Sequence, residues 1–296
     1  WIGRSFLLDI GGSHENIIVA GRFGNKYFKN RHSVEPESDD FFHNTKLILG
    51  SFTFRKIKYN ESRMILSFGK TEDVPIGFLF QLTSGLLNNE FRKKPYIGFK
   101  LASTFYWEDI GYFGAGIGFG SFIREDRLNE SVFRIEGLYF NRLIRLKSLR
   151  IRNIIRYNFI TGYKMPDYRT IDLEDEIHFL SEETQDGQQK LNLNLESVIF
   201  TPLNFYGLRF AFVPFADIGF ISAGNNILKD RSFYGTFGFA CRLKNESLIF
   251  DTIQLYIAYC PVVSDDMSSW NFEFSTSEQV LFRYIEISKP EIIQYE

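Results

Sequence analysis

A strict alternation of apolar and polar residues is the feature that most constrains how this 296-residue chain can fold. It is clearest in residues 190–196, which read Lys-Leu-Asn-Leu-Asn-Leu-Glu. Successive side chains of a β-strand point to opposite faces of a sheet, so this period predicts a strand with one apolar and one polar face. The pattern recurs along the chain in segments of about 9–12 residues, the length of a tilted strand that crosses a bilayer. The sequence therefore predicts an all-β fold, a transmembrane antiparallel up-and-down β-barrel of about 14 to 16 strands.

The composition agrees with a barrel. Aromatic residues make up 17% of the chain, with 33 Phe and 15 Tyr, which suits aromatic girdles at two membrane interfaces. The mean hydropathy is −0.15, and no uncharged apolar run reaches the roughly 18 residues that a transmembrane helix needs. A soluble β-sandwich or soluble barrel is the alternative, but such a fold would carry less aromatic surface. The net charge of −2 comes without a basic stripe, which argues against nucleic acid as a partner.

One predicted strand has glycine at every second position. Between Phe113 and Phe119 the apolar residues alternate with four glycines on the other face: Gly114, Gly116, Gly118 and Gly120. Glycine in a strand marks either a close approach by another backbone or a strong bend. Both interpretations stay open at this point.

The predicted strand at 149–160 carries three arginines on one face, Arg150, Arg152 and Arg156, opposite an apolar face. An arginine that faced lipid near the bilayer midplane would cost about 2–4 kcal/mol. We therefore expect these three side chains to line a lumen filled by water or by protein. They form either part of a salt-bridged interior or a basic selectivity patch.

Two long connections interrupt the strand pattern, residues 24–43 and residues 163–188. The second is acidic, but its carboxylates lack the regular spacing of a calcium loop, so we interpret it as a solvated loop. The strand count includes a short strand at 62–68, after a turn at Asn60-Glu61-Ser62. Counting backward from a periplasmic C-terminus places 163–188 outside the cell and 24–43 on the periplasmic side, unless a further strand lies near 24–43.

A short motif follows the acidic connection by one strand, Phe215-Ala216-Asp217-Ile218-Gly219. With the strands around it, this aromatic-x-Asp-x-Gly motif resembles the closing strands of the surface-antigen barrel of the BamA/TamA-like outer-membrane assembly and two-partner-secretion superfamily. The resemblance implies a barrel of about sixteen strands in a bacterial outer membrane. It also implies a long extracellular loop folded back into the lumen, and a role in the insertion or export of outer-membrane proteins. The lumen motif would then be Asp217, with Phe215 and Gly219 beside it.

In that family, an Arg-Gly-Phe arginine of the inward-folded loop pairs with the strand aspartate. No Arg-Gly-Phe occurs between residues 163 and 188 of this chain. A buried carboxylate is costly without a partner, so another group must take that place. Arg169 and His178 are the candidates within the loop, and Arg209 and the three arginines of 149–160 are candidates on the wall.

This departure from the family motif leaves two other functions open. The chain is then a transport pore or structural barrel with an arginine-lined lumen, or the membrane anchor of a fused hydrolase domain. We expect residues 1–287 to form the barrel, with first strands or a periplasmic domain before Trp1, and residues 288–296 to form a C-terminal tail. Residues 280–287 either continue the last strand or pack on the periplasmic rim.

The sequence indicates no enzyme. It contains no Gly-x-Ser-x-Gly elbow and no phosphate-binding loop, and its histidines lack metal-ligand spacing: His14, His32, His43 and His178. We therefore expect no catalytic residue, no metal and no cofactor. Cys241 and Cys260 are predicted on opposite faces, which argues against a disulfide between them.

The expected partners are outer-membrane lipid and lipopolysaccharide, with other outer-membrane or periplasmic proteins in a complex. Residue usage rich in Asn, Lys, Ile and Phe resembles that of Bacteroidetes-like bacteria.

Overall fold

The protein is described by a computed structural model, which covers residues 1–10, 13–31, 33–35, 42–65, 68–69, 71–125, 127–173, 177–180, 186–224, 230–245, 252–261, 268–276 and 282–295. In these residues the chain forms one antiparallel sheet of 14 strands, which confirms the all-β prediction. No helix in the described part of the chain is both long enough and apolar enough to span a membrane.

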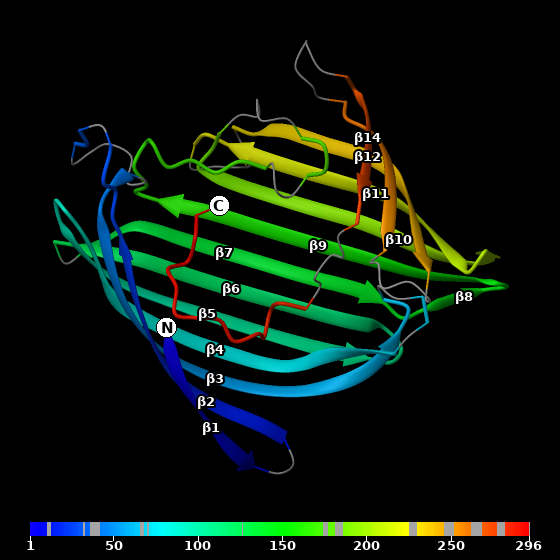
Figure 1. The fold of residues 1–296 in the computed structure, drawn as a ribbon, viewed down its shortest axis with the longest axis horizontal. Coiled ribbons are helices and arrows are strands. Elements are labelled where there is room, and N and C mark those ends of the chain that lie inside the picture. The colour runs from blue at the N-terminus through cyan, green and yellow to red at the C-terminus, as the bar shows by residue number, and fades with distance from the viewer. Residues whose placement is uncertain are drawn as a thin grey trace.

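The strands follow one another across the sheet in chain order (Figure 1). The short β8 pairs with the beginning of β9 where β7 stops, so it continues β7 and leaves 13 strands side by side. Their bounds are β1 (Ile2–Ile10), β2 (Ser13–Lys26), β3 (Thr45–Arg63), β4 (Thr71–Asn89), β5 (Lys93–Trp107), β6 (Gly111–Arg124), β7 (Arg127–Asn141), β8 (Ile144–Leu146), β9 (Leu149–Tyr163), β10 (Gln189–Phe205), β11 (Leu208–Ser222), β12 (Ser232–Asn245), β13 (Ile253–Tyr259) and β14 (Trp270–Ser275).

The sheet is strongly curved, and its two faces differ as the alternation predicts. On β10, the polar residues point to the concave side and are buried: Lys190, Asn192, Asn194 and Glu196. On β5, the apolar residues of the convex side are exposed, with Ile97 41% and Phe105 47% accessible, whereas Ala102 on the concave side is 1% accessible. The convex side is thus apolar and open. The concave side is covered and mixed in character, with the polar row of β10 beside a buried apolar cluster that includes Phe140, Val198 and Val213.

β1 and β14 are the two edges of the sheet, and no pairing joins them among the described residues. Neighbouring strands alternate in direction, so with 13 strands side by side β1 and β14 run the same way. An antiparallel ladder between β1 and β14 is therefore impossible without a further strand between them. The closed barrel stays a prediction.

The two long connections lie at the same end of the sheet, 27–44 after β2 and 164–188 after β9. Their predicted placement at opposite ends is wrong. Residues 60–63, expected as a turn and a new strand, continue β3 and pair with β4 as far as Arg63. In its described residues, the stretch 62–68 is therefore not a separate strand, and one strand fewer separates the two connections than predicted. Because each antiparallel strand leads to the opposite end of the sheet, this difference moves the two connections to the same end. No extra strand lies between Lys26 and Thr45 in the residues described there.

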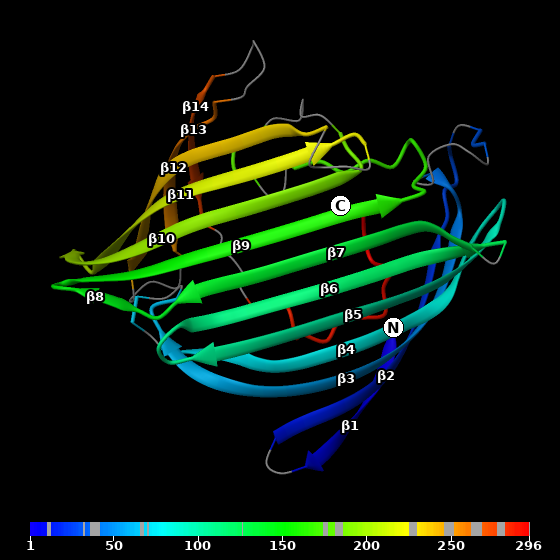
Figure 2. The same cartoon turned by 180° about the vertical axis from the view of Figure 1, so that it is seen from behind.

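After β14 the chain crosses the concave face of the sheet, as Figures 1 and 2 show from opposite sides. We call residues 282–295 the interior tail. It neither extends β14, which ends at Ser275, nor packs on the rim. Its Ile285 is 1% accessible and packs with Ile57, Leu79 and Ala102 of the wall. Burial of such apolar side chains holds the tail inside.

The interior tail lies close to two of the alternating glycines of β6. A Cβ at Gly118 would lie 3.0 Å from Ile293 Cδ1 of the tail, and one at Gly120 would lie 3.1 Å from Ile293 Cβ. These distances are tighter than ordinary side-chain contacts. The nearest atoms to all four glycines are side-chain atoms: those of Tyr112 at Gly114, of Glu136 at Gly116, of Ile293 at Gly118 and of Tyr96 at Gly120. The glycine face thus leaves room for side chains, and both interpretations, close approach by another backbone and a bend, stay predictions.

Candidate functional site

Two segments fill the concave side of the sheet, and their contacts with the wall form the candidate site. One is the interior tail. The other is the connection between β9 and β10, whose described residues (164–173, 177–180 and 186–188) we call the interior loop. Both lie over the concave face (Figure 1).

Asp217 of β11 anchors the interior loop. Its carboxylate is 1% accessible and accepts hydrogen bonds from His178 Nδ1 at 2.6 Å, from the His178 backbone N–H at 3.2 Å and from Asn194 Nδ2 at 2.8 Å. The imidazole ring also lies 5.3 Å from the ring of Phe215 and 5.6 Å from that of Tyr256, centroid to centroid. Of the two loop candidates, His178 is therefore the one that contacts Asp217.

The protonation of His178 depends on this contact. Burial opposes the charged imidazolium, but the hydrogen bond to Asp217 and the negative charge of that carboxylate outweigh burial, so the pKa of His178 is raised. The imidazolium and the carboxylate then form a charge-assisted hydrogen bond, which is stronger than a neutral one.

Each residue of the aromatic-x-Asp-x-Gly motif has a separate contact with the interior loop. Phe215 packs on the His178 ring, and Asp217 binds it. A Cβ at Gly219 would lie 2.5 Å from Ile177 Cδ1 and 2.8 Å from Leu173 Cδ1. Glycine at position 219 is thus needed for the loop to reach the wall.

Arg169, the other loop candidate, lies elsewhere. Its guanidinium is 3.6 Å from Glu130 of β7, and Glu130 also pairs with Lys94 of β5 at 2.9 Å. Arg169 therefore fixes the beginning of the loop to the β5–β7 wall, away from Asp217.

A buried carboxylate that the sequence analysis did not select lies beside the Asp217 site. Glu196 of β10 forms ion pairs with Arg156 and with Arg242, the latter at 3.0 Å. Arg242 Nε also donates to Gln254 Oε1 at 2.7 Å. The available signal was the inward phase of Glu196 in the alternating stretch 190–196, which turns a charged side chain to the concave side.

The three arginines of β9 do not form one patch. Arg152 is 1% accessible and donates to the backbone carbonyls of Arg63 and Asn141, both at 2.7 Å, and to Met64 O at 3.2 Å. Arg156 pairs with Glu196, and Arg150 donates to two carbonyls of its own hairpin. The bonds of Arg152 hold the β3–β4 turn across the interior, where Ile65 is fully buried. This arrangement agrees with the salt-bridged interior.

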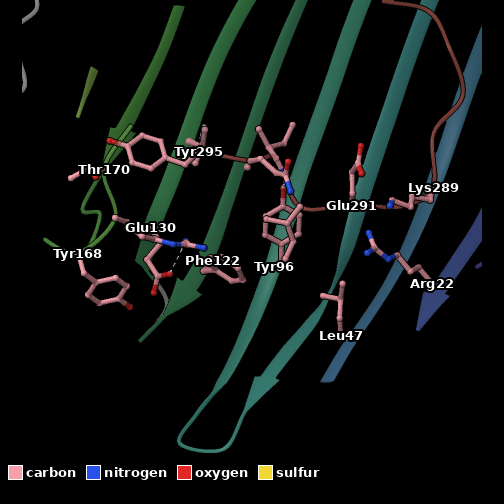
Figure 3. A pocket seen from close by; sticks show the side chains of 16 residues that line it. Arg22, Leu47, Tyr96, Phe122, Glu130, Tyr168, Thr170, Lys289, Glu291 and Tyr295 are labelled. Atoms are coloured by element: carbon pink, nitrogen blue, oxygen red, sulfur yellow. Dashed lines mark hydrogen bonds and ion pairs between the residues drawn. The ribbon is translucent and has the colours of Figure 1, made fainter. Parts of the chain in front are cut away.

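A cavity of about 470 Å³ lies between the interior tail, the interior loop and the wall at the end of the long connections (Figure 3). Arg22 Nη1 donates to Pro290 O of the tail at 3.2 Å, and the Ile293 N–H donates to the Tyr96 hydroxyl at 2.8 Å. The Tyr295 hydroxyl donates to Gln188 O of the loop at 2.8 Å. Burial raises the pKa of Tyr295, which keeps this donor protonated.

No metal centre is found in the residues that the structure describes, since no group of three His, Cys, Asp or Glu side chains there could hold an ion. His43 is buried against Glu35 O and Asn89, and Cys241 and Cys260 are free thiols. The side chain of His14 and the whole of His32 lie outside the described residues.

These features define a class of protein, an all-β chain whose single curved antiparallel sheet has an apolar convex face and an occupied concave face lined by both polar and apolar side chains. Comparison with known proteins takes the assignment no further. No protein-family model matches the sequence, and no curated protein matches it.

Proposed function

We propose that this chain is an outer-membrane β-barrel protein that acts in the insertion or export of outer-membrane proteins. The observation that supports a membrane location is the convex face. Large apolar side chains are exposed there along successive strands, for example Phe52 at 42%, Phe99 at 38% and Leu255 at 46% accessible. A contiguous apolar surface of this extent is unfavourable in water and favourable against lipid. Outer-membrane lipid and lipopolysaccharide would surround it.

The lengths of the connections support an orientation. Outer-membrane barrels have short periplasmic turns and longer extracellular loops. The connections 27–44 and 164–188 share one end of the sheet, and the two-residue turn 206–207 lies at the other. In this orientation β14 ends on the periplasmic side, and the interior tail brings Tyr295 back toward the extracellular end, against Val132, Ile160 and Ile171.

The two open edges support a role in handling other β-strands. β1 and β14 run in the same direction, so one incoming strand that runs opposite to them can form an antiparallel ladder with either edge, or with both. The Cys260 N–H donates to Ser269 O at 2.8 Å in the β13–β14 hairpin. Hydrogen-bond direction alternates along a strand, so the amide of Asn271 faces β13 and the amide of Phe272 faces the open edge.

The test is insertion of an unfolded eight-stranded outer-membrane barrel into lipid vesicles that contain the purified full chain. We expect the chain to accelerate insertion over empty vesicles, and Phe272→Pro to remove most of the acceleration, because proline has no N–H to donate to an incoming strand. Phe272→Ala keeps the amide and is the matched control for the loss of the ring. An unchanged rate with Phe272→Pro, or no acceleration by the unaltered chain, would contradict the proposal.

The transport-pore alternative has less support. This alternative requires a basic patch of Arg150, Arg152 and Arg156. Arg152 and Arg156 are instead held by buried acceptors on other strands or turns. An arginine whose donors are already satisfied has little capacity to select passing anions.

A further inference from the structure

We propose that the concave face of the sheet is a binding groove for a polypeptide segment, and that the interior tail occupies this groove in cis. The partner is a segment of another, unfolded outer-membrane polypeptide that carries the same anchors as the tail. The identity of this partner rests on the proposed function, whereas the groove rests on the contacts alone.

Three side chains of the tail serve here as anchors, and Phe282, Tyr284 and Ile292 make further apolar contacts with the wall. Ile285 enters the first of three apolar sockets, against Ile57 and Leu79. Ile293 enters the second, over the floor that Gly118 leaves open, and it also packs on the neighbouring cluster that holds Tyr295.

Tyr295 enters the third socket, which Val132, Ile160 and Ile171 form. A Cβ at Gly162 would lie 2.8 Å from the Tyr295 ring, so a side chain at position 162 would close this socket. The anchors define a pattern in the bound segment: an aliphatic residue, seven intervening residues, a second aliphatic residue, one further residue and an aromatic residue. The segment turns at the first anchor, where the Glu286 N–H donates to Arg283 O at 3.4 Å.

Between the anchors, wall side chains bind the backbone of the tail. Arg22 donates to Pro290 O, and the Tyr96 hydroxyl accepts from the Ile293 N–H. Contacts with the backbone do not depend on the sequence of the bound segment. Within the described residues, the tail forms no backbone–backbone hydrogen bond with any strand. It therefore lies in the sheet's interior without belonging to the sheet, and another segment can replace it.

Three polar side chains of the tail leave room for other sequences. Lys289, Glu291 and Gln294 are exposed and line the cavity of about 470 Å³ between tail and loop (Figure 3). Substitution at these three positions removes no apolar burial. The groove thus tolerates variation at these three polar positions, whereas Tyr284, Pro290 and Ile292 lie between or beside the anchors and are packed or buried.

The test uses the full chain, folded in detergent micelles, with the sequence of residues 277–281 replaced by the recognition site of a specific protease. A fluorescent peptide of residues 282–295 is added before and after cleavage. We expect the cleaved protein to bind the peptide, and the uncut protein to bind it at least about tenfold more weakly, because the tethered tail has a high effective concentration. No binding after the tail has been cut and washed away would overturn the groove.

Peptide variants test the anchors and the tolerance separately. A peptide with Ile293→Asp and Tyr295→Ala should lose at least about tenfold in affinity, since both sockets would be unfilled. A peptide with Lys289→Ser, Glu291→Ser and Gln294→Ser is the matched control and should compete fully. Failure of this control would mean that the groove accepts only the chain's own tail, and would overturn a partner in trans.

A change in the wall gives an independent readout. Gly118→Val in the cleavable chain should abolish peptide binding, because an added Cβ would lie 3.0 Å from Ile293 Cδ1 of the bound segment and 4.0 Å from Arg134 Cβ of the wall. Gly50→Ala, whose added Cβ would have its nearest neighbour 3.9 Å away, should leave binding unchanged. None of these measurements contains a membrane-insertion step. Peptide binding without insertion activity would refute the proposed function alone, and insertion activity without peptide binding would refute the groove alone.

Discussion

Replacing His178 by alanine should release the interior loop from the wall. The substitution removes the Nδ1 donor from a carboxylate that is 1% accessible, and leaves Asp217 with the Asn194 amide and one backbone N–H. A hydrogen bond to a charged group contributes about 1.5–3 kcal/mol. The ratio of docked to undocked loop should therefore fall roughly tenfold to 150-fold.

Hydrogen exchange of the backbone amides of residues 177–180, followed by mass spectrometry on the protein in micelles, measures this ratio. Exchange should be faster in His178→Ala by the same factor. Asp217→Asn keeps the side-chain shape and removes the charge, so it should give a smaller increase in the same direction. The double variant should be less affected than the sum of the single variants, because both changes remove one interaction. Equal exchange in His178→Ala and the unaltered chain would refute the assigned anchor.

The same anchor should depend on pH. Asp217 raises the pKa of His178, with Glu196 adding to the effect and Arg156 opposing it. A group whose pKa is higher when docked than when undocked favours docking when it is protonated. The contribution of this pair should be complete below the ordinary histidine pKa of about 6.5 and be lost as pH rises through the raised value. His178→Ala should remove this step from the pH dependence of exchange, after correction for the intrinsic exchange rate.

Other consequences of the interior contacts can be measured in the same preparations. Gly219→Val should speed exchange at 177–180, since its side chain would overlap Ile177, whereas Gly224→Ala should not, because its Cβ would have 3.8 Å of clearance. Arg152→Ala should lower the free energy of unfolding in urea by about 3 kcal/mol, because it strips donors from buried carbonyls, whereas Arg150→Ala, whose acceptors lie in its own hairpin, should change it by less than about 1 kcal/mol. The full chain should give no steady conductance in planar bilayers, and release of the interior tail should produce steady events; an open channel in the unaltered chain would contradict an occupied interior.

Local alternation was enough to predict the strand faces, because the side-chain period of a strand is fixed by backbone geometry. The phase of β9, with Arg152 and Asn158 inward, follows from it directly. The turn expected at residues 60–62 failed for a different reason. Asn and Ser favour turns locally, but here they lie within a 19-residue strand whose partners on β4 supply a continuous ladder.

The interior was less predictable, since it depends on contacts between residues far apart in the chain. Asp217 and His178 were each selected, one by a strand motif and the other as a loop cation, but nothing local decides between His178 and Arg169. The tail was missed altogether. Its alternating run at 280–287 is typical of a strand, and nothing else in the sequence placed it inside the sheet.

The two segments that fill the interior stabilise each other. Tyr295 of the tail donates to Gln188 O at one end of the interior loop, and its ring packs on Ile171 near the other end. A segment that occupies the third socket therefore has more contacts when the loop is docked. By thermodynamic linkage, whatever docks the loop raises the affinity of the groove for the segment, and the segment favours docking by the same factor. Protonation of His178 strengthens its bond to Asp217 and so favours the docked loop. Because Tyr295 contacts the docked loop, protonation should also strengthen binding of the tail. A histidine in this position, in contrast to an arginine that stays charged at every physiological pH, should make docking of the loop, and through it the affinity of the groove, fall as pH rises above the ordinary histidine pKa of about 6.5.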